Sequence, residues 1–240
     1  MINLTPTLVP RTLRLDRLTS IATDSHGARV EPLTVALAKQ QQRITSTSED
    51  ALVAIWIAAA RAAFEQATGR QTITASWELQ MYDPICGTIL ELPRPPLLSV
   101  ESIGYTDAGG VAQVFDPSLY TVTPSIAVPP DPATLDPFCP PGRITLAAGA
   151  AWPTGPLVIA RTCGYGDTPE AMPPILTAAL CLFVGHLYAH REAVTSETLT
   201  AIPLGLEPMC QAFKWTAFDA GRQGVTSSTP DAIPMPWGGR

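Results

Sequence analysis

Two sets of side chains in this sequence have the types and spacing that chemistry would need: a histidine pair, and a cysteine beside a glycine turn. His186 and His190 flank the segment HLYAH, so on a helix both imidazoles share one face. Such a pair can ligate zinc. The segment lacks the glutamate of the HExxH motif, and the nearby candidates for a third ligand are Cys181 and Glu192. We therefore expect no metal site, and interpret His190 as a group that caps the helix end.

Cys163 is the candidate nucleophile, because it stands in CGYG at the end of an expected strand and His186 occurs elsewhere in the chain. Nothing in the sequence resembles an oxyanion hole. Gly164 and Gly166 belong to no GxGxxG or GxxxxGK motif, so we interpret them as a turn that needs positive φ. A Cys-dependent hydrolase using Cys163 and His186 stays open as an alternative. The first interpretation has no catalytic residue and no cofactor.

Composition narrows the class of protein. The chain has 240 residues, of which 46% are hydrophobic and 15% charged, so we expect a sizeable core and a surface that partners cover. Five cysteines without paired spacing predict reduced thiols and synthesis in a cytoplasm. The start, MINLTPTLVP, lacks the basic region of a signal peptide, and no apolar run reaches membrane-spanning length. We expect no membrane association.

The acidic residues are concentrated in the middle of the chain. Residues 71–170 hold ten acidic and three basic side chains, within a chain whose formal net charge is −6. Such a region repels phosphate, which argues against a nucleic-acid grip there. A solvated acidic face is the simplest interpretation.

The periodicity of apolar residues predicts helices at about residues 35–43, 49–68, 174–191 and 206–217. Ser46 and Glu49 have capping-box spacing before the second helix, and Gly69 supplies its stop. Pro174 opens the third, whose apolar side chains surround it and predict a central buried helix.

Residues 71–163 predict a small antiparallel β unit, because short alternating segments such as QTITASWELQMY and SVESIGYT recur there. Asp107-Ala-Gly-Gly between two of them is a hairpin signal. Residues 124–141 contain seven prolines and predict a loop inserted on the exposed side of this unit. The sequence thus predicts an α+β fold in which helices pack with a small antiparallel β unit.

Extended arms flank the expected core, which covers residues 31–217. Residues 1–30 predict an irregular, mildly basic arm, and residues 218–240 a Gly/Pro/Ser-rich tail. Within the tail, Ile233, Met235 and Trp237 are spaced by two, as in an extended segment that lays alternate side chains into a partner's groove. A frayed terminus is the alternative.

These motifs, in this order, resemble the phage head–tail connector family, also called head-completion or portal-adaptor proteins, with relatives in gene transfer agents. The resemblance covers about residues 32–217. Its elements are EDAL at 49–52, TGR at 68–70, Trp77, LPRPPLLSVESIGYTDAGG at 92–110, GYG at 164–166, HxYxxREA at 186–193 and PLG at 203–205. The loop at 124–141 is longer than the family pattern, and the tail extends beyond it.

The resemblance implies a structural virion protein in the neck between head and tail. It implies a homo-oligomeric ring of twelve subunits below the portal protein, which meets stopper or tail proteins and continues a channel for double-stranded DNA. A stopper one ring further down, or an assembly factor that leaves before maturation, stays open. On this basis we assign portal docking to Trp215, Phe218, Ile233, Met235 and Trp237, subunit packing to Trp56, Ala59 and Ala63, and channel-facing acidic groups to Asp107, Asp131 and Asp136.

Overall fold

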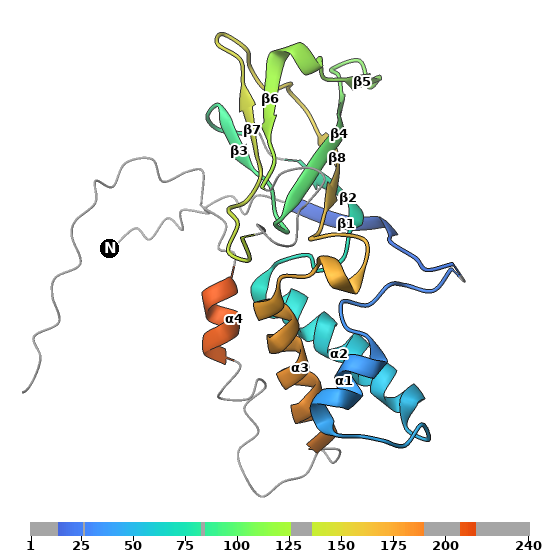
Figure 1. The fold of residues 1–240 in the computed structure, drawn as a ribbon. Helices are drawn as coiled ribbons and strands as arrows, with labels where there is room; N and C mark the ends of the chain where they lie inside the picture. Colours follow the sequence, from blue (N-terminus) through green and yellow to red (C-terminus); the bar gives the residue numbers. More distant parts are fainter. Residues whose placement is uncertain (1–13, 26, 83–84, 126–135, 190–206, 215–240) are drawn as a thin grey trace, which may run out of the picture.

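The computed structural model describes residues 14–25, 27–82, 85–125, 136–189 and 207–214. These residues form an α+β fold, with a β unit at one end and a helical unit at the other (Figure 1). The predicted fold class is confirmed.

The β unit consists of two antiparallel sheets. The larger has the strand order β1-β2-β8-β4-β5 and the smaller the order β3-β7-β6. The strands are β1 (Arg14–Ile21), β2 (Ala75–Met81), β3 (Ile89–Glu91), β4 (Leu97–Thr106), β5 (Ala112–Val114), β6 (Tyr120–Thr123), β7 (Arg143–Leu146) and β8 (Leu157–Cys163). Two short 3₁₀ helices, η1 (Pro117–Leu119) and η2 (Pro169–Ala171), lie in the connections.

The helical unit contains α1, α2, α3 and α4. Their bounds are Val35–Gln42, Asp50–Thr68, Pro174–Ala189 and Glu207–Phe213. These agree with the predicted helices, although residues 190–191, 206 and 215–217 of the expected ranges lie outside the described residues. Among the helices that the structure describes, none combines the length and apolarity needed to cross a membrane.

The two ends of α2 differ in how well the sequence predicted them. Gly69 adopts the left-handed conformation (φ 69°) and its N–H donates to Glu65 O at 2.9 Å, so the predicted stop is confirmed. The predicted capping box of Ser46 and Glu49 is not formed, so this prediction is wrong. Glu49 occupies the N-cap position without a side-chain capping bond, and Ser46 Oγ instead accepts from the backbone N–H of Ser48 at 3.1 Å.

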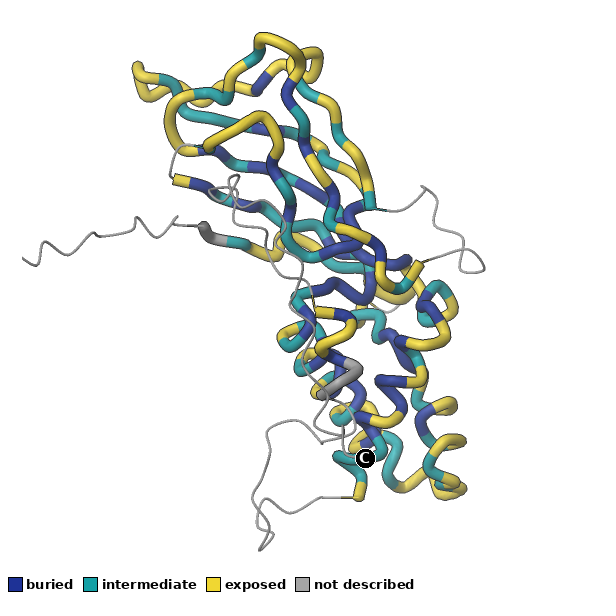
Figure 2. The backbone as a smooth tube through the Cα atoms, turned by 90° about the vertical axis from the view of Figure 1, so that its left-hand side faces the viewer, coloured by how far each residue is buried: buried dark blue, intermediate teal, exposed yellow. Residues whose placement is uncertain are grey.

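Buried residues run through both units (Figure 2), and their apolar side chains form three clusters among the described residues. One cluster fills the space between the two sheets. A second joins the β unit to the helices through Tyr165, Phe64 and Phe213. A third packs α2 on α3 and α1. The predicted central buried helix is only partly buried, because α3 leaves Ile175 and Leu182 exposed.

The irregular arm predicted over residues 1–30 is wrong for Arg14–Ile21, which form the edge strand β1 beside β2. Arg17, Leu18 and Thr19 are exposed there, so the segment shows none of the apolar alternation that identifies a strand. Backbone pairing and the ion pairs of Asp16 hold it instead.

The loop at 124–141 is not simply an insertion on the exposed side. Its described ends pack against the rest of the chain. Ser125 exchanges two hydrogen bonds with Leu97, its N–H donating to Leu97 O and its Oγ accepting from Leu97 N. Cys139 is 1% exposed and belongs to the cluster that joins the two units. Residues 126–135 lie outside the described part of the chain.

The positive φ predicted for the glycine turn after β8 is confirmed for Gly164 and wrong for Gly166, which is not among the glycines with positive φ. At Gly166 the close approach of the Ala171 side chain leaves no room for a Cβ. Gly164 has φ 134°, and a Cβ there would meet Thr74 N at 2.6 Å. Only glycine fits both the backbone angle and the close approach of the neighbouring chain.

Candidate assembly surfaces

Cys163 does not have the environment of a nucleophile. The residue is fully buried at the end of β8, and this burial raises the pKa of its thiol to about 11. At neutral pH the group is therefore a thiol rather than the reactive thiolate. His186 is half-buried on α3 in the helical unit. These observations argue against the hydrolase alternative.

Of the histidine pair, His186 lies on α3 and His190 lies outside the described residues. Within the part of the chain that the structure describes, no group of three or more His, Cys, Asp or Glu side chains is placed to hold a metal ion.

Arg70 is a buried clamp at the junction of the two units, directly after the Gly69 stop of α2. Its Nε donates to Phe213 O at 2.6 Å, and both terminal nitrogens donate to Cys139 O at 3.2 Å. Its Nη1 also lies 3.2 Å from Tyr165 Oη. Arg70 therefore ties together the end of α4, the end of the proline-rich loop and the glycine turn, three segments far apart in the sequence.

Arg161 forms a second buried arginine site, in the middle of the larger sheet. Its side chain is fully buried, and Nη2 donates to Asp16 Oδ1 at 2.6 Å. The other carboxylate oxygen of Asp16 accepts from Arg94 Nε at 2.6 Å, and Arg94 lies over the Trp77 ring at 3.8 Å. Nε and Nη1 of Arg161 have no hydrogen-bond partner among the described residues. Asp16 is thus the counter-ion that fixes β1 to the sheet.

The roles of Arg70 and Arg161 were not predicted from the sequence. For Arg161 a signal exists, because strand alternation in LVIARTC places it on the same face as Ile159 and Cys163, which is the buried face. For Arg70 the sequence shows only that the residue follows Gly69 at the helix end. Its hydrogen bonds could not be predicted, because Phe213 and Cys139 lie far away in the sequence.

Two of the three candidate acidic residues lie among the described residues, each in a turn of its own. Asp107 is partly exposed in the β4–β5 turn, where it accepts from the N–H groups of Gly109 and Val111, and these bonds lower its pKa. Asp136 is exposed and accepts from Phe138 N at 2.8 Å. Asp131 lies outside the described residues. Both described carboxylates have local turn roles that keep them at the surface.

The residues assigned to subunit packing divide between the interior and the surface. Trp56 packs edge-on against Tyr188 of α3, with ring centroids 5.4 Å apart, and Ala63 packs on the same cluster. Ala59 is exposed. The residues assigned to portal docking, Trp215, Phe218, Ile233, Met235 and Trp237, lie outside the described residues.

One face of α2 forms an exposed apolar ridge. Leu52 is 37% exposed and Ile55 63% exposed, and Ala59 and Ala62 continue the line toward the C-terminal end of the helix. We call these four residues the α2 ridge. Their 3-4-3 spacing makes one stripe on a helix, about 15 Å long. The ridge carries no charged side chain.

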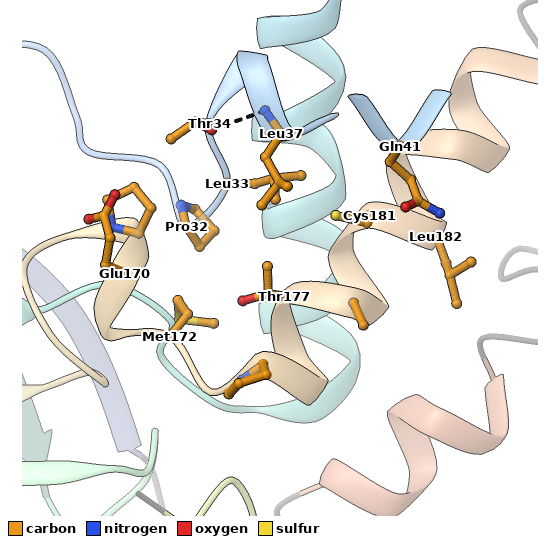
Figure 3. Close-up of a pocket in the computed structure, with 13 residues that line it drawn as sticks. Pro32, Leu33, Thr34, Leu37, Gln41, Glu170, Met172, Thr177, Cys181 and Leu182 are labelled. Atoms are coloured by element: carbon orange, nitrogen blue, oxygen red, sulfur yellow. Dashed lines mark hydrogen bonds between the residues drawn. The ribbon is translucent and has the colours of Figure 1, made fainter. Parts of the chain in front are cut away.

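An apolar groove of about 570 Å³ lies between α1 and α3 (Figure 3). Leu33 and Leu37 reach it from the α1 side, and Thr177 and Leu182 come from α3. We call it the α1–α3 groove. Leu37 is 40% exposed and Leu182 49% exposed, so apolar surface is open to solvent here. Glu170 is the only charged residue that lines the groove.

Solved structures with a similar fold come from gene transfer agent particles. A chain from the neck of an empty particle, computed with C6 symmetry, gives a TM-score of 0.64 at 22% identity, over 87% of this chain and 99% of that chain. A chain from the virion of a native particle gives 0.62 at 22% identity, over 84% and 96%. A chain from the neck of a native particle, computed with C12 symmetry, gives 0.58 at 22% identity, over 85% and 100%.

No protein-family model matches this sequence, and no curated protein matches it. The structural likeness extends over nearly the whole length of each neck chain, so it includes both the β unit and the helices. The chain therefore has the fold of neck components of gene transfer agent particles, which is consistent with the resemblance of its sequence to head–tail connectors.

Proposed function

We propose that this chain is a structural neck protein of a tailed, phage-like particle. In this role it forms a ring below the portal protein, joins the DNA-filled head to the tail, and continues the DNA channel. The observation that carries the proposal is the fold match to a neck chain over 87% of this chain and 99% of the other. The ordered sequence motifs support it independently.

The ring is proposed to have twelve subunits, as the resemblance implies. The C6 and C12 symmetries of the solved necks support a cyclic assembly. A ring needs two different, complementary surfaces on each subunit, and the helical unit offers two apolar surfaces without a partner in the described chain.

A structural neck protein needs no catalytic residue, and the surroundings of Cys163, the strongest catalytic candidate, support this role. A nucleophilic cysteine must be accessible and easily deprotonated. Cys163 is fully buried and its pKa is raised to about 11. Its side chain fills the core between the sheets.

Portal docking is proposed for Trp215 and for the tail residues Phe218, Ile233, Met235 and Trp237. What supports this is their place in the chain. Arg70 holds the end of α4 at Phe213, two residues before Trp215 in the sequence, so the last described helix is fixed next to the start of this segment. The acidic residues Asp107, Asp131 and Asp136 are proposed to face the channel, where repulsion keeps DNA mobile. The exposure of Asp136 is compatible with that role.

The direct test is binding to the portal protein of the same particle. The purified chain mixed with assembled portal should give a complex whose mass fits a ring of subunits on the portal. A stopper one ring further down would not bind portal alone and would bind only the complex of portal with its adaptor. A chain that ignores both would contradict the proposal.

A further inference from the structure

The α2 ridge and the α1–α3 groove lie on opposite sides of the helical unit. At about 100° per residue, the ridge residues stand opposite Val53, Ile57 and Ala60, which pack in the interior. The groove is lined by the outward face of α3, whose Leu176, Ala179 and Leu180 face the core instead. In Figure 3, α2 passes behind the groove.

The two surfaces also match in shape and charge. The ridge is convex, with Ile55 as its most exposed side chain and alanines that let a partner approach closely. The groove is concave and apolar. The charged residues of α2 near the ridge are already paired within the chain, Asp50 with Lys39 and Arg61 with Glu31 and Glu65. Contact between the surfaces would therefore bury little charge, as in the centre of a protein interface.

From this geometry we infer that the α2 ridge of one copy inserts into the α1–α3 groove of the next copy. The contact joins two different surfaces, so it repeats head to tail instead of stopping at a dimer, and in the proposed ring the rotation between neighbouring copies closes the repeat. The second copy is the occupant that fits, because both halves of the contact are present on one chain, and because the similar solved chains stand in cyclic necks. The inference rests on the proposed ring and names the side chains that close it.

Disulfide trapping tests this contact in the full chain. Cys86 is the exposed native thiol and Cys181 lines the groove, so the background carries Cys86→Ser and Cys181→Ala. Ile55→Cys and Leu182→Cys are then combined, and the purified chain is oxidised and run on a non-reducing gel. We expect a ladder that extends past the dimer. A transient contact is enough for trapping, so the readout does not require a stable ring.

Matched controls separate the possible outcomes. Leu182→Cys combined with Val114→Cys, on the exposed strand β5, should give no ladder. Dimers from Ile55→Cys alone would mean a symmetric α2–α2 contact and overturn the inference. Efficient intramolecular crosslinking of Leu182→Cys to Met235→Cys would mean that the chain's own tail fills the groove, which also overturns it. An oxidised chain with Ile55→Cys and Leu182→Cys that stays monomeric would also overturn the inference.

Charge substitutions give a second readout that a folding defect would not reproduce. Here the trapped pair is Ile55→Cys with Leu37→Cys, which lies in the same groove as Leu182. Adding Leu182→Glu should lower the yield of crosslinked chains by about tenfold or more, because the contact would bury a carboxylate without a partner. Adding Ala59→Lys should restore part of the yield. Portal binding is measured on the same proteins. A chain that binds portal without a ladder overturns the interface alone, and a ladder without portal binding overturns the proposed function alone.

Discussion

Nε of Arg70 donates a hydrogen bond of 2.6 Å to the carbonyl oxygen of Phe213, a residue 143 positions later in the chain. The bond joins the residue after α2 to the last residue of α4. It fixes the end of the last described helix, two residues before Trp215 in the sequence, and so connects the stability of the junction to the proposed docking function.

Replacing this arginine should loosen the junction. Arg70→Met removes the donors for Phe213 O, Cys139 O and the Tyr165 hydroxyl, and each buried acceptor left without a partner costs about 1–3 kcal/mol. We expect the free energy of unfolding in urea to fall by roughly 3 kcal/mol. The matched control is Arg143→Met, which breaks a half-exposed ion pair with Glu91 and should cost less than about 1 kcal/mol. Equal losses for the two variants would contradict the clamp.

Asp16, the counter-ion of Arg161, should contribute strongly to the free energy of unfolding although its side chain is 20% exposed. Asp16→Asn leaves a fully buried guanidinium without its carboxylate, which costs roughly 3–5 kcal/mol. Combining it with Arg161→Met should recover much of that loss, because the unpaired buried charge is then gone. Urea unfolding of the single and double variants measures this. A double variant no more stable than Asp16→Asn alone would refute the assignment.

The buried thiol predicts a pattern of chemical labelling. In the native chain at pH 7.5, a maleimide should modify Cys86 rapidly and Cys163 only after unfolding. Mass spectrometry of labelled peptides reports both sites. Rapid native labelling of Cys163 would revive the hydrolase alternative.

The same thiol predicts a pH dependence of stability. Its pKa is about 11 in the folded chain and about 9 as the reference, so the folded state favours the protonated form. This contribution is fully present below pH 9 and is lost as the pH rises through 11, a change of roughly 3 kcal/mol. Thermal or urea unfolding between pH 8 and 11 should show this decline. Cys163→Ala should flatten the corresponding part of the curve, and an unchanged slope would contradict the assignment.

The tail is proposed to serve binding rather than folding. Truncation before residue 218 removes Phe218, Ile233, Met235 and Trp237 and none of the described residues that form the buried clusters. We expect portal binding to be lost while the urea midpoint stays unchanged. A truncated chain that binds portal as tightly as the full chain would refute tail docking.

Local signals allowed the helices and the glycine turn to be predicted. Gly69 and Gly164 have the positive φ angles that their neighbours in sequence indicated. The antiparallel β unit was also predictable, because alternation and hairpin chemistry are encoded within a few residues.

Features that depend on distant partners were not predictable. Strand β1 was missed because Asp16 is held by Arg161, 145 residues away, and not by an apolar pattern of its own. Trp56 packs edge-on against Tyr188 of α3, a contact between distant parts of the chain that leaves the tryptophan half-buried. The candidate interface appears only when α1 and α3 come together to form a groove opposite the exposed side of α2.

The measurement that tests the central claim most directly is the mass of the purified full chain, alone and then mixed with assembled portal. The account predicts a monomer or small oligomer that joins the portal as a ring, with a mass near twelve copies of the 25.5 kDa chain. A chain that stays indifferent to portal over the same concentrations would contradict it.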